Sequence, residues 1–195
     1  MVPCEMHSLV LFFFIWKERI IMRIFLVAGK AGSGKNEVAK LIKEFYIYKH
    51  QQSAITHYSK YIKNFALELT DWDGTDGNKP RSFMQEIGDK IRQKDPNYFT
   101  GNMIRDIEVY SDYVHNLIIS DVRMPNEIEE IKENYDEVYA IYVVNQFGSS
   151  KLSIQEQSHI TETALEGYDE FDYTIANDSL ATLKEKIFKY LEGLE

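Results

Sequence analysis

Two kinds of hydrophobic pattern alternate along this chain. Short continuous apolar runs, at residues 24–27, 117–120 and 138–144, are typical of strands that are buried on both faces. Two further runs, at 53–58 and 171–176, predict additional strands. Between these runs, apolar residues recur three or four positions apart, which predicts helices. Strands that alternate with helices indicate a three-layer α/β fold around a five-stranded parallel sheet.

Local signals place the ends of several predicted helices. The first helix spans about 35–49 and the second spans 60–69. Pro125 suits the first turn of a later helix, and Asp178 or Ser179 caps the last one. The apolar faces that we expect to be buried are Val38, Leu41, Ile42 and Phe45 in the first helix, Ile62, Phe65, Ala66 and Leu69 in the second, and Leu180, Leu183, Ile187 and Leu191 in the last.

A glycine-rich segment lies between the first predicted strand and the first predicted helix. Residues 29–35 read Gly-Lys-Ala-Gly-Ser-Gly-Lys, which matches the phosphate-binding pattern G-x-x-x-x-G-K. In this context, backbone N–H groups and the helix N-terminus can cradle a polyphosphate. The alternative is a turn that binds nothing, and the strand–turn–helix context argues against it. The predicted ATP-binding residues are Gly29, Lys30, Ala31, Gly32, Ser33, Gly34, Lys35 and Asn36.

The residue after the loop lysine departs from the common pattern. Position 36 is Asn, where Ser or Thr usually binds Mg²⁺. An amide oxygen can also bind a hard cation, so Asn36 is a candidate magnesium ligand. Asp121, just after the third predicted strand, is the second candidate. Its alternative role is to cap a helix or stabilise a loop.

Two groups of charged and polar side chains are candidates for binding a substrate, one at the end of a predicted strand and one on a predicted helix. Asp121 and Arg123 would reach one phosphate site, because ligands bind at the carboxyl ends of parallel strands. Arg81, Gln85 and Arg92 share one side of a predicted helix, where Arg suits phosphate and Gln suits a base edge. A solvated helix surface is an equally good interpretation of that spacing.

Composition narrows the classes of function. The chain has 195 residues and a net charge of −9, which argues against binding long nucleic acid but not against a small anionic substrate. Its single Cys excludes a disulfide framework and a multi-cysteine zinc site. A reducing cytoplasm is therefore the expected compartment.

The first 21 residues precede the predicted domain. Their apolar run at 9–16 is too short to span a membrane and lacks the flanks of a signal peptide. We expect an over-extended start or an apolar tail, with Met22 as the start of the folded domain at 22–195.

Four motifs together resemble one family. They are Gly-Lys-x-x-Ser-Gly-Lys at 29–35, Arg-x-x-x-Gln-x-x-Gly at 81–88, Ser-Asp-Val-Arg-x-Pro-Asn-Glu at 120–127 and His-x-Thr-Glu at 159–162. This set resembles the phage-type deoxynucleoside monophosphate kinases, over nearly all of residues 22–195. A non-hydroxyl residue after the loop lysine also occurs in that family and in the related animal phosphomevalonate kinases, where it is usually Asp.

The resemblance implies a nucleoside monophosphate kinase fold with a lid. ATP and Mg²⁺ would lie on the loop, the monophosphate under the helices of residues 59–110, and the lid at 145–157. The implied substrate contacts are Lys63, Arg81, Gln85, Arg92, Asp121 and Arg123. The implied catalytic residues are Lys35, Asp121, Arg123 and Lys151. Such lids usually carry arginines, whereas this one offers only Lys151, so Arg123 and Arg81 are the alternatives for that role.

The sequence therefore predicts an ATP-dependent kinase that acts on a small nucleotide. We do not expect the protein to bind a membrane. The alternatives are a kinase for phosphomevalonate or dephospho-coenzyme A, and a nucleotide-binding regulatory module without transfer activity. Asn36 and the arginine-poor lid are the features that favour the regulatory module. The preferred base and the oligomeric state, a homodimer among the options, stay open.

Overall fold

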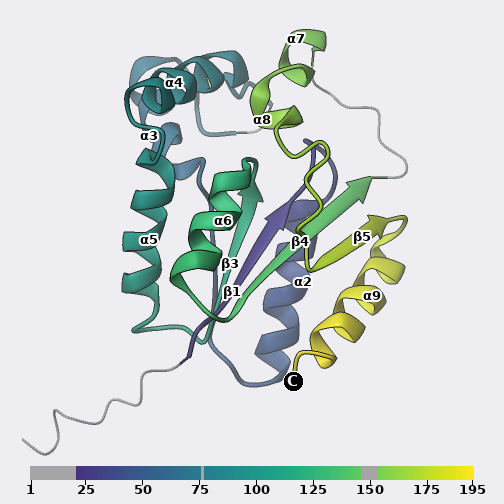
Figure 1. Ribbon diagram of the computed structural model, residues 1–195. Helices are drawn as coiled ribbons and strands as arrows, with labels where there is room; N and C mark the ends of the chain where they lie inside the picture. The colour runs from purple at the N-terminus through teal and green to yellow at the C-terminus, as the bar shows by residue number, and fades with distance from the viewer. Residues whose placement is uncertain (1–20, 76, 146–152) are drawn as a thin grey trace, which may run out of the picture.

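A parallel sheet with helices on both faces forms the centre of the molecule (Figure 1). The computed structural model describes residues 21–75, 77–145 and 153–195. The strands are β1 (Arg23–Ala28), β2 (Ser53–Thr56), β3 (Asn116–Val122), β4 (Val138–Asn145) and β5 (Tyr173–Asn177). Their order in the sheet is β2-β3-β1-β4-β5, and every pair is parallel. The predicted fold class, a three-layer α/β fold with five parallel strands, is thus confirmed.

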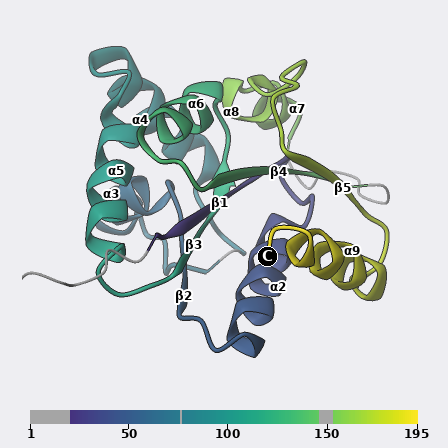
Figure 2. The same ribbon diagram turned by 60° about the horizontal axis from the view of Figure 1, so that its bottom comes forward.

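The helices divide between the two faces of the sheet (Figure 2). On one face lie α2 (Lys35–Tyr48) and α9 (Leu180–Glu192), which pack against each other. On the other face lie α3 (Lys60–Leu69), α4 (Arg81–Lys94), α5 (Tyr98–Tyr110) and α6 (Pro125–Asn134). Two short helices, α7 (Ile154–Gln157) and α8 (Ile160–Thr163), lie near the carboxyl ends of the strands. None of the helices within the described ranges is long and apolar enough to cross a membrane.

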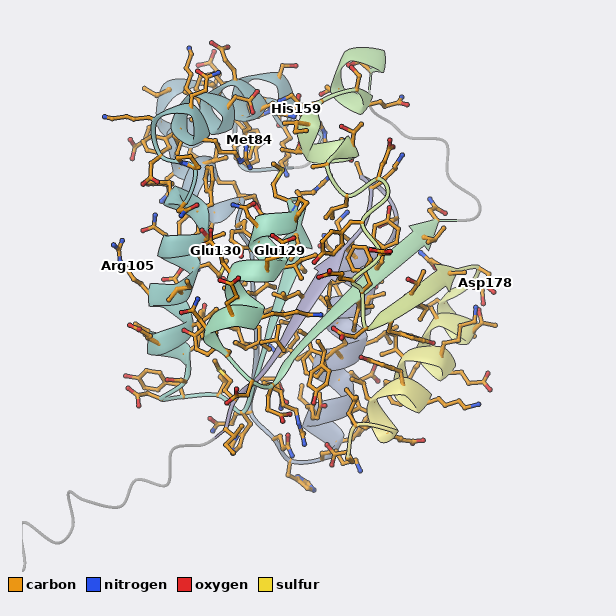
Figure 3. All side chains as sticks on the ribbon, in the orientation of Figure 1. Met84, Arg105, Glu129, Glu130, His159 and Asp178 are labelled. Atoms are coloured by element: carbon orange, nitrogen blue, oxygen red, sulfur yellow. The ribbon has the colours of Figure 1, made fainter. Side chains whose placement is uncertain are left out.

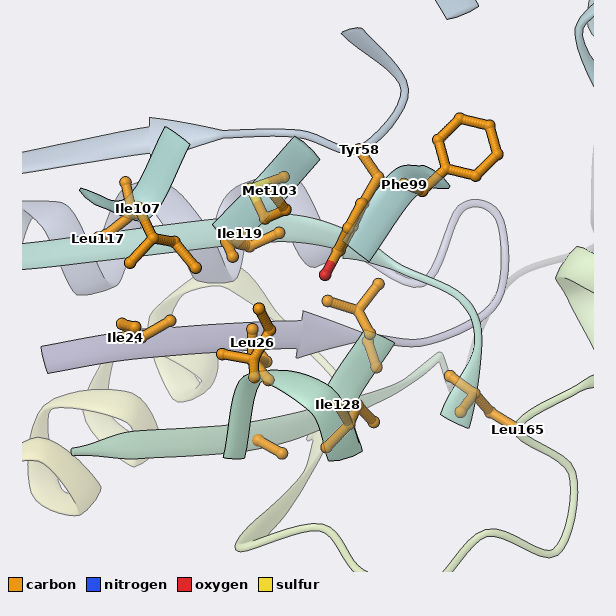
Figure 4. Packing of buried hydrophobic residues seen from close by; sticks show 14 of the residues in the cluster. Ile24, Leu26, Tyr58, Phe99, Met103, Ile107, Leu117, Ile119, Ile128 and Leu165 are labelled. Atoms are coloured by element: carbon orange, nitrogen blue, oxygen red, sulfur yellow. The ribbon is translucent and has the colours of Figure 1, made fainter. Parts of the chain in front are cut away.

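Two hydrophobic clusters explain why the central strands are continuously apolar. Alternate residues of β1 enter different clusters: Ile24 and Leu26 face α5 and α6, whereas Phe25 and Val27 face α2 and α9. All four side chains are fully buried, as expected for a parallel strand that is covered on both faces. Figure 4 shows the first cluster, in which Met103 and Ile107 of α5 pack against the strands.

Three expectations about buried helix faces need correction. The face of α2 is buried as predicted, but Phe65 and Leu69 of α3 and Leu180 of α9 are exposed. These residues lie toward the ends of their helices or beside their packed faces, where no neighbouring element covers them. Ser179 is the cap of α9, since its side-chain oxygen accepts the N–H of Thr182 at 3.2 Å.

Candidate phosphate-binding site

The glycine-rich loop has a backbone that side chains would obstruct. Gly29 has φ 142°, and a Cβ at this position would lie 2.5 Å from the carbonyl oxygen of Val143. Gly34 has φ 98°, and a Cβ there would collide with the side chain of Asn177. Because L side chains avoid positive φ, both positions require glycine. The loop then leads directly into α2, so its N–H groups and the helix N-terminus can face one ligand.

Lys35 folds back over the loop that precedes it. Its Nζ donates to the carbonyl oxygens of Gly29 at 2.6 Å and Lys30 at 2.7 Å. Burial, together with the nearby charge of Arg123, lowers the pKa of Lys35 to about 7. A bound polyphosphate would supply the negative charge that favours the ammonium form.

Two asparagines hold the loop from the ends of neighbouring strands. Asn145, the last residue of β4, donates its side-chain N–H to the carbonyl oxygen of Gly32 at 3.1 Å. Asn177, the last residue of β5, donates to the carbonyl oxygen of Ser33 at 3.0 Å. These two amides fix consecutive peptide groups, and therefore the directions of the N–H groups that follow them.

Arg123 and Glu162 lie beside the loop, at the end of β3 and in α8. Arg123 Nη1 pairs with Glu162 and also donates to the carbonyl oxygen of Thr161 at 3.3 Å. The other oxygen of Glu162 accepts the N–H of Ala31 at 2.9 Å. Together they border a small pocket. Its lining residues are Gly29, Lys30, Arg123, Tyr142, Thr161, Glu162 and Leu165.

Glu127 orients the backbone that carries Arg123. Its carboxylate accepts the N–H groups of Arg123 at 2.7 Å and of Met124 at 3.1 Å, which completes a capping box at the start of α6. The side chain is buried, and this burial raises the pKa of Glu127 to about 7. The Pro-Asn-Glu part of the predicted motif is therefore explained by helix capping.

Asp121 is committed to backbone contacts in this structure. Its two carboxylate oxygens accept the N–H groups of Tyr58 at 2.7 Å and Ser59 at 2.9 Å, where α3 begins. The role as a cap, given above as an alternative to magnesium binding, is therefore realised. Each oxygen of this carboxylate keeps a lone pair that could bind a metal ion. The predicted metal role of Asp121 therefore stays untested.

Asn36 is exposed and begins a short chain of polar contacts. Its amide oxygen accepts the hydroxyl of Ser120 at 3.4 Å, and that hydroxyl lies 2.7 Å from Nδ1 of His57. Burial lowers the pKa of His57. Oxygen donors from Asn36 and Ser120 thus lie next to each other, as a hard cation would require. The described ranges hold no cluster of three or more His, Cys, Asp or Glu residues that could bind a metal alone.

The predicted substrate residues on the helices are partly buried. Arg92 packs over the ring of Phe99 at 4.7 Å, on the side of α4 that faces α5. Arg81, at the other end of α4, lies near the charge of Glu156 in α7. Lys63 of α3 is close enough to His57 to act on its charge, and Gln85 lies midway along α4.

Part of the predicted lid lies outside the described residues. Lys151 belongs to 146–152 and residues 1–20 are likewise not described, so the predictions for both stay untested. The described part of the predicted lid at 145–157 contains regular structure. Asn145 ends β4, and α7 begins at Ile154.

Sequence reasoning missed several residues of the site. Asn177 ends the fifth strand, so the rule that ligands bind at strand ends could have found it. Glu162 and His159 were part of a recognised motif, but their spacing gives no information about their partners. His57 belonged to no recognised pattern, and Ser120 began the motif at 120–127 without being assigned a role.

Comparison with known families identifies the family of this chain. The profile of the family described as phosphomevalonate kinase matches residues 27–137, which is more than half of the chain. The chain belongs to the phosphomevalonate kinase family. The match extends from the glycine-rich loop through α3, α4 and α5 to the Asp121–Arg123 region. No curated protein sequence matches the chain.

Solved structures with a similar fold share little sequence identity with this chain. An APS kinase from Mycobacterium tuberculosis is 12% identical, with 88% of this chain and 97% of that chain covered and a TM-score of 0.45. A sugar kinase from Janibacter sp. is 13% identical, with 88% and 95% covered and a TM-score of 0.48. A shikimate kinase from Aquifex aeolicus is 14% identical, with 88% and 97% covered and a TM-score of 0.45.

Membership of the phosphomevalonate kinase family confirms the broader part of the prediction. The protein is a small-molecule kinase with a phosphate-binding loop, and thus a phosphotransferase. The narrower resemblance to phage-type deoxynucleoside monophosphate kinases stays a prediction.

Proposed function

We propose that this kinase transfers the γ-phosphoryl group of ATP to the phosphate of a deoxynucleoside or nucleoside 5′-monophosphate. One observation supports the transfer step above all: Arg123 lines the same small pocket as Gly29 and Lys30, whose carbonyl oxygens accept hydrogen bonds from Nζ of Lys35. Two cations at that place suit two phosphates that must approach each other.

The loop fits the triphosphate of ATP. The N–H groups that Asn145 and Asn177 help to orient would bind the phosphate oxygens, and Lys35 would leave the carbonyls of Gly29 and Lys30 to join them. Asn36, with Ser120 beside it, and Asp121 are the candidates to hold Mg²⁺. When bound, the ion would neutralise charge between the β- and γ-phosphates.

Positioning and charge would provide the catalysis. The acceptor phosphate would lie between the loop and the helices α3 and α4, with one of its oxygens in line with the γ-phosphorus. Arg123 would stabilise the negative charge that develops on the transferred group, and a covalent intermediate on the enzyme is unnecessary. The pocket is bordered by the same Arg123, Gly29 and Lys30, which supports a transfer site at this place.

The acceptor side supports a nucleotide through its mixture of side chains. Arg81 and Arg92 can form paired hydrogen bonds with phosphate, and Gln85 can pair with the edge of a base. All three come from α4, and Lys63 comes from the neighbouring α3. We therefore expect Gln85 to affect the choice of base and Arg81 to affect every acceptor alike.

A second acceptor, phosphomevalonate, is favoured by the family match itself. It offers a phosphate for Arg81 and Arg123 but no base for Gln85. The discriminating experiment is an acceptor panel of the common deoxynucleoside and ribonucleoside monophosphates, phosphomevalonate and dephospho-coenzyme A. The assay measures ATP-dependent formation of the phosphorylated product of each acceptor, with Mg²⁺ present.

The variants Gln85→Ala and Arg81→Ala make the panel decisive. We expect Gln85→Ala to change the ranking among bases, since an unpaired buried polar group costs about 1–3 kcal/mol. Arg81→Ala should weaken all phosphorylated acceptors by a similar factor. Turnover of phosphomevalonate alone would overturn the nucleotide proposal, and ATP binding without any turnover would support the regulatory module.

A further inference from the structure

The segment around α8 connects the acceptor helix α4 with the glycine-rich loop. At one end, His159 Nε2 lies 2.9 Å from the carboxylate of Asp89 on α4. Figure 3 labels His159, which precedes α8, and Met84 of α4. Three residues later, Glu162 contacts the loop and Arg123. The His-x-Thr-Glu motif thus places its first and last residues on opposite sides of the proposed transfer site.

His159 has a partner at each ring nitrogen. Nδ1 lies 3.2 Å from the backbone nitrogen of Thr161 and 2.9 Å from its hydroxyl oxygen, and Nε2 faces the carboxylate of Asp89. An imidazole with both nitrogens engaged holds α8 in a fixed orientation against α4.

Glu162 lies where a negative charge opposes the binding of phosphate, so a role in packing alone does not explain it. Its side chain is only 9% exposed, and it brings a negative charge to the site that the proposed function assigns to phosphates. A carboxylate there repels a bound polyphosphate. Its two oxygens are satisfied by Ala31 N–H and by Arg123, the two groups that would otherwise bind phosphate.

We propose that Glu162 is a positioning residue that fixes the guanidinium of Arg123 against the glycine-rich loop. The contact between His159 and Asp89 ties this arrangement to the acceptor helix. Arg123 has five N–H donors, and the pair with Glu162 leaves others free for a phosphate oxygen. This inference rests on the proposed function, because it assigns Arg123 to the transferring phosphoryl group.

The proposal predicts opposite effects on binding and on turnover. Glu162→Gln can still accept the Ala31 N–H but removes the repelling charge. The Kd for ATP without acceptor should therefore stay equal or fall, as measured by calorimetry. At saturating substrates, kcat should fall about 10- to 100-fold, the usual cost of losing a group that orients a site residue. A merely structural role would weaken both ATP binding and turnover.

Glu166→Gln is the matched control for charge. Glu166 also lies beside the loop, where it pairs with Lys30 at 2.5 Å, but it is exposed and does not contact Arg123. This control should change kcat by no more than about twofold, as is usual for exposed ion pairs. A fall in kcat as large as that of Glu162→Gln would overturn the proposal.

A double-mutant cycle tests whether Glu162 acts through Arg123. The variant with both Arg123→Ala and Glu162→Gln should be no slower than Arg123→Ala alone, because the second change has nothing left to position. Multiplicative losses would contradict the proposal. The contact between His159 and α4 is tested separately. Asp89→Ala should lower kcat, and Asp89→Asn should restore most of it, since its amide oxygen can still accept a hydrogen bond from His159.

An NMR measurement separates this inference from the identity of the substrate. The Nε–Hε signal of Arg123 should report a fixed guanidinium in the natural protein and a mobile one in Glu162→Gln. An unchanged signal would overturn the positioning role even if the kinase turns over. If no acceptor on the panel reacts, the proposed function fails, and the NMR result still decides the position of Arg123.

Discussion

At the scale of single residues, two buried ionisable groups have opposite consequences for pH. Lys35 carries a pKa lowered to about 7, and Glu127 carries one raised to about 7, in each case mainly because burial disfavours the charged form. Lys35 can regain its charge from a ligand, whereas Glu127 is enclosed by the start of α6. The first therefore affects binding, and the second affects stability.

Binding of ATP should take up a proton above pH 7. Free Lys35 is largely neutral at pH 8, and the phosphates favour its ammonium form, so the Kd for ATP should rise from pH 7 to pH 9. The rise is limited to about tenfold per pH unit for one proton. Calorimetry in two buffers with different ionisation enthalpies measures the uptake. Lys35→Met should lose this contribution, and equal proton uptake in the variant would contradict the assignment.

Glu127 should lower stability as the pH rises from 4.5 to 7. In this window the folded protein keeps a proton that the unfolded chain has released, so the free energy of unfolding falls with pH. A pKa shift from 4.5 to about 7 limits the change to about 3 kcal/mol. Urea unfolding between pH 4.5 and pH 7.5 measures it. Glu127→Gln, whose amide oxygen can accept both N–H groups, should lack this part of the slope.

At the scale of elements, strands were easier to predict than helix faces. β1 and β3 are continuously apolar because each is covered on both sides, and the sequence pattern reflects that burial directly. The faces of α3 and α9 were less predictable, because a helical period does not show where neighbouring elements end. The short helix α7 has too few residues to produce any period.

The site was predictable in its loop but not in its supporting contacts. Gly29, Gly34 and Lys35 form a local motif with a known geometry. The contacts of Asn145 and Asn177 with the loop bridge 113 and 144 positions of sequence. They depend on the strand order β1-β4-β5, which the alternation of strands and helices does not specify.

The ends of β4 and β5 should therefore control the affinity of the loop for phosphate. Asn177→Ala removes the hydrogen bond to Ser33 and leaves space beside Gly34. We expect the Kd for ATP to rise about fivefold, which corresponds to one lost hydrogen bond of about 1 kcal/mol. Asn177→Asp is the sharper comparison, because a carboxylate cannot donate to Ser33. An unchanged Kd in both variants would show that the loop keeps its shape without this contact.

At the scale of the whole molecule, the site lies where the two helical layers meet. β1 contributes to both hydrophobic clusters and ends at the glycine-rich loop. The loop continues into α2 on one face, while α3 and α4 approach from the other face (Figure 2). ATP and its acceptor would thus be held by different layers, with β1 and β3 as the common support.

We expect the fold of the described domain to form without the residues before Met22. Every residue of the two hydrophobic clusters in the described ranges lies at Met22 or after it, and β1 begins at Arg23. A chain that begins at Met22 should therefore unfold with a free energy within about 0.5 kcal/mol of that of the full chain, the usual range for changes outside the core. Its kcat should also be unchanged, since all the site residues are retained. Urea unfolding and the acceptor assay measure the two quantities. A larger loss of stability would assign residues 1–21 to the fold, and a loss of kcat alone would assign them to the site.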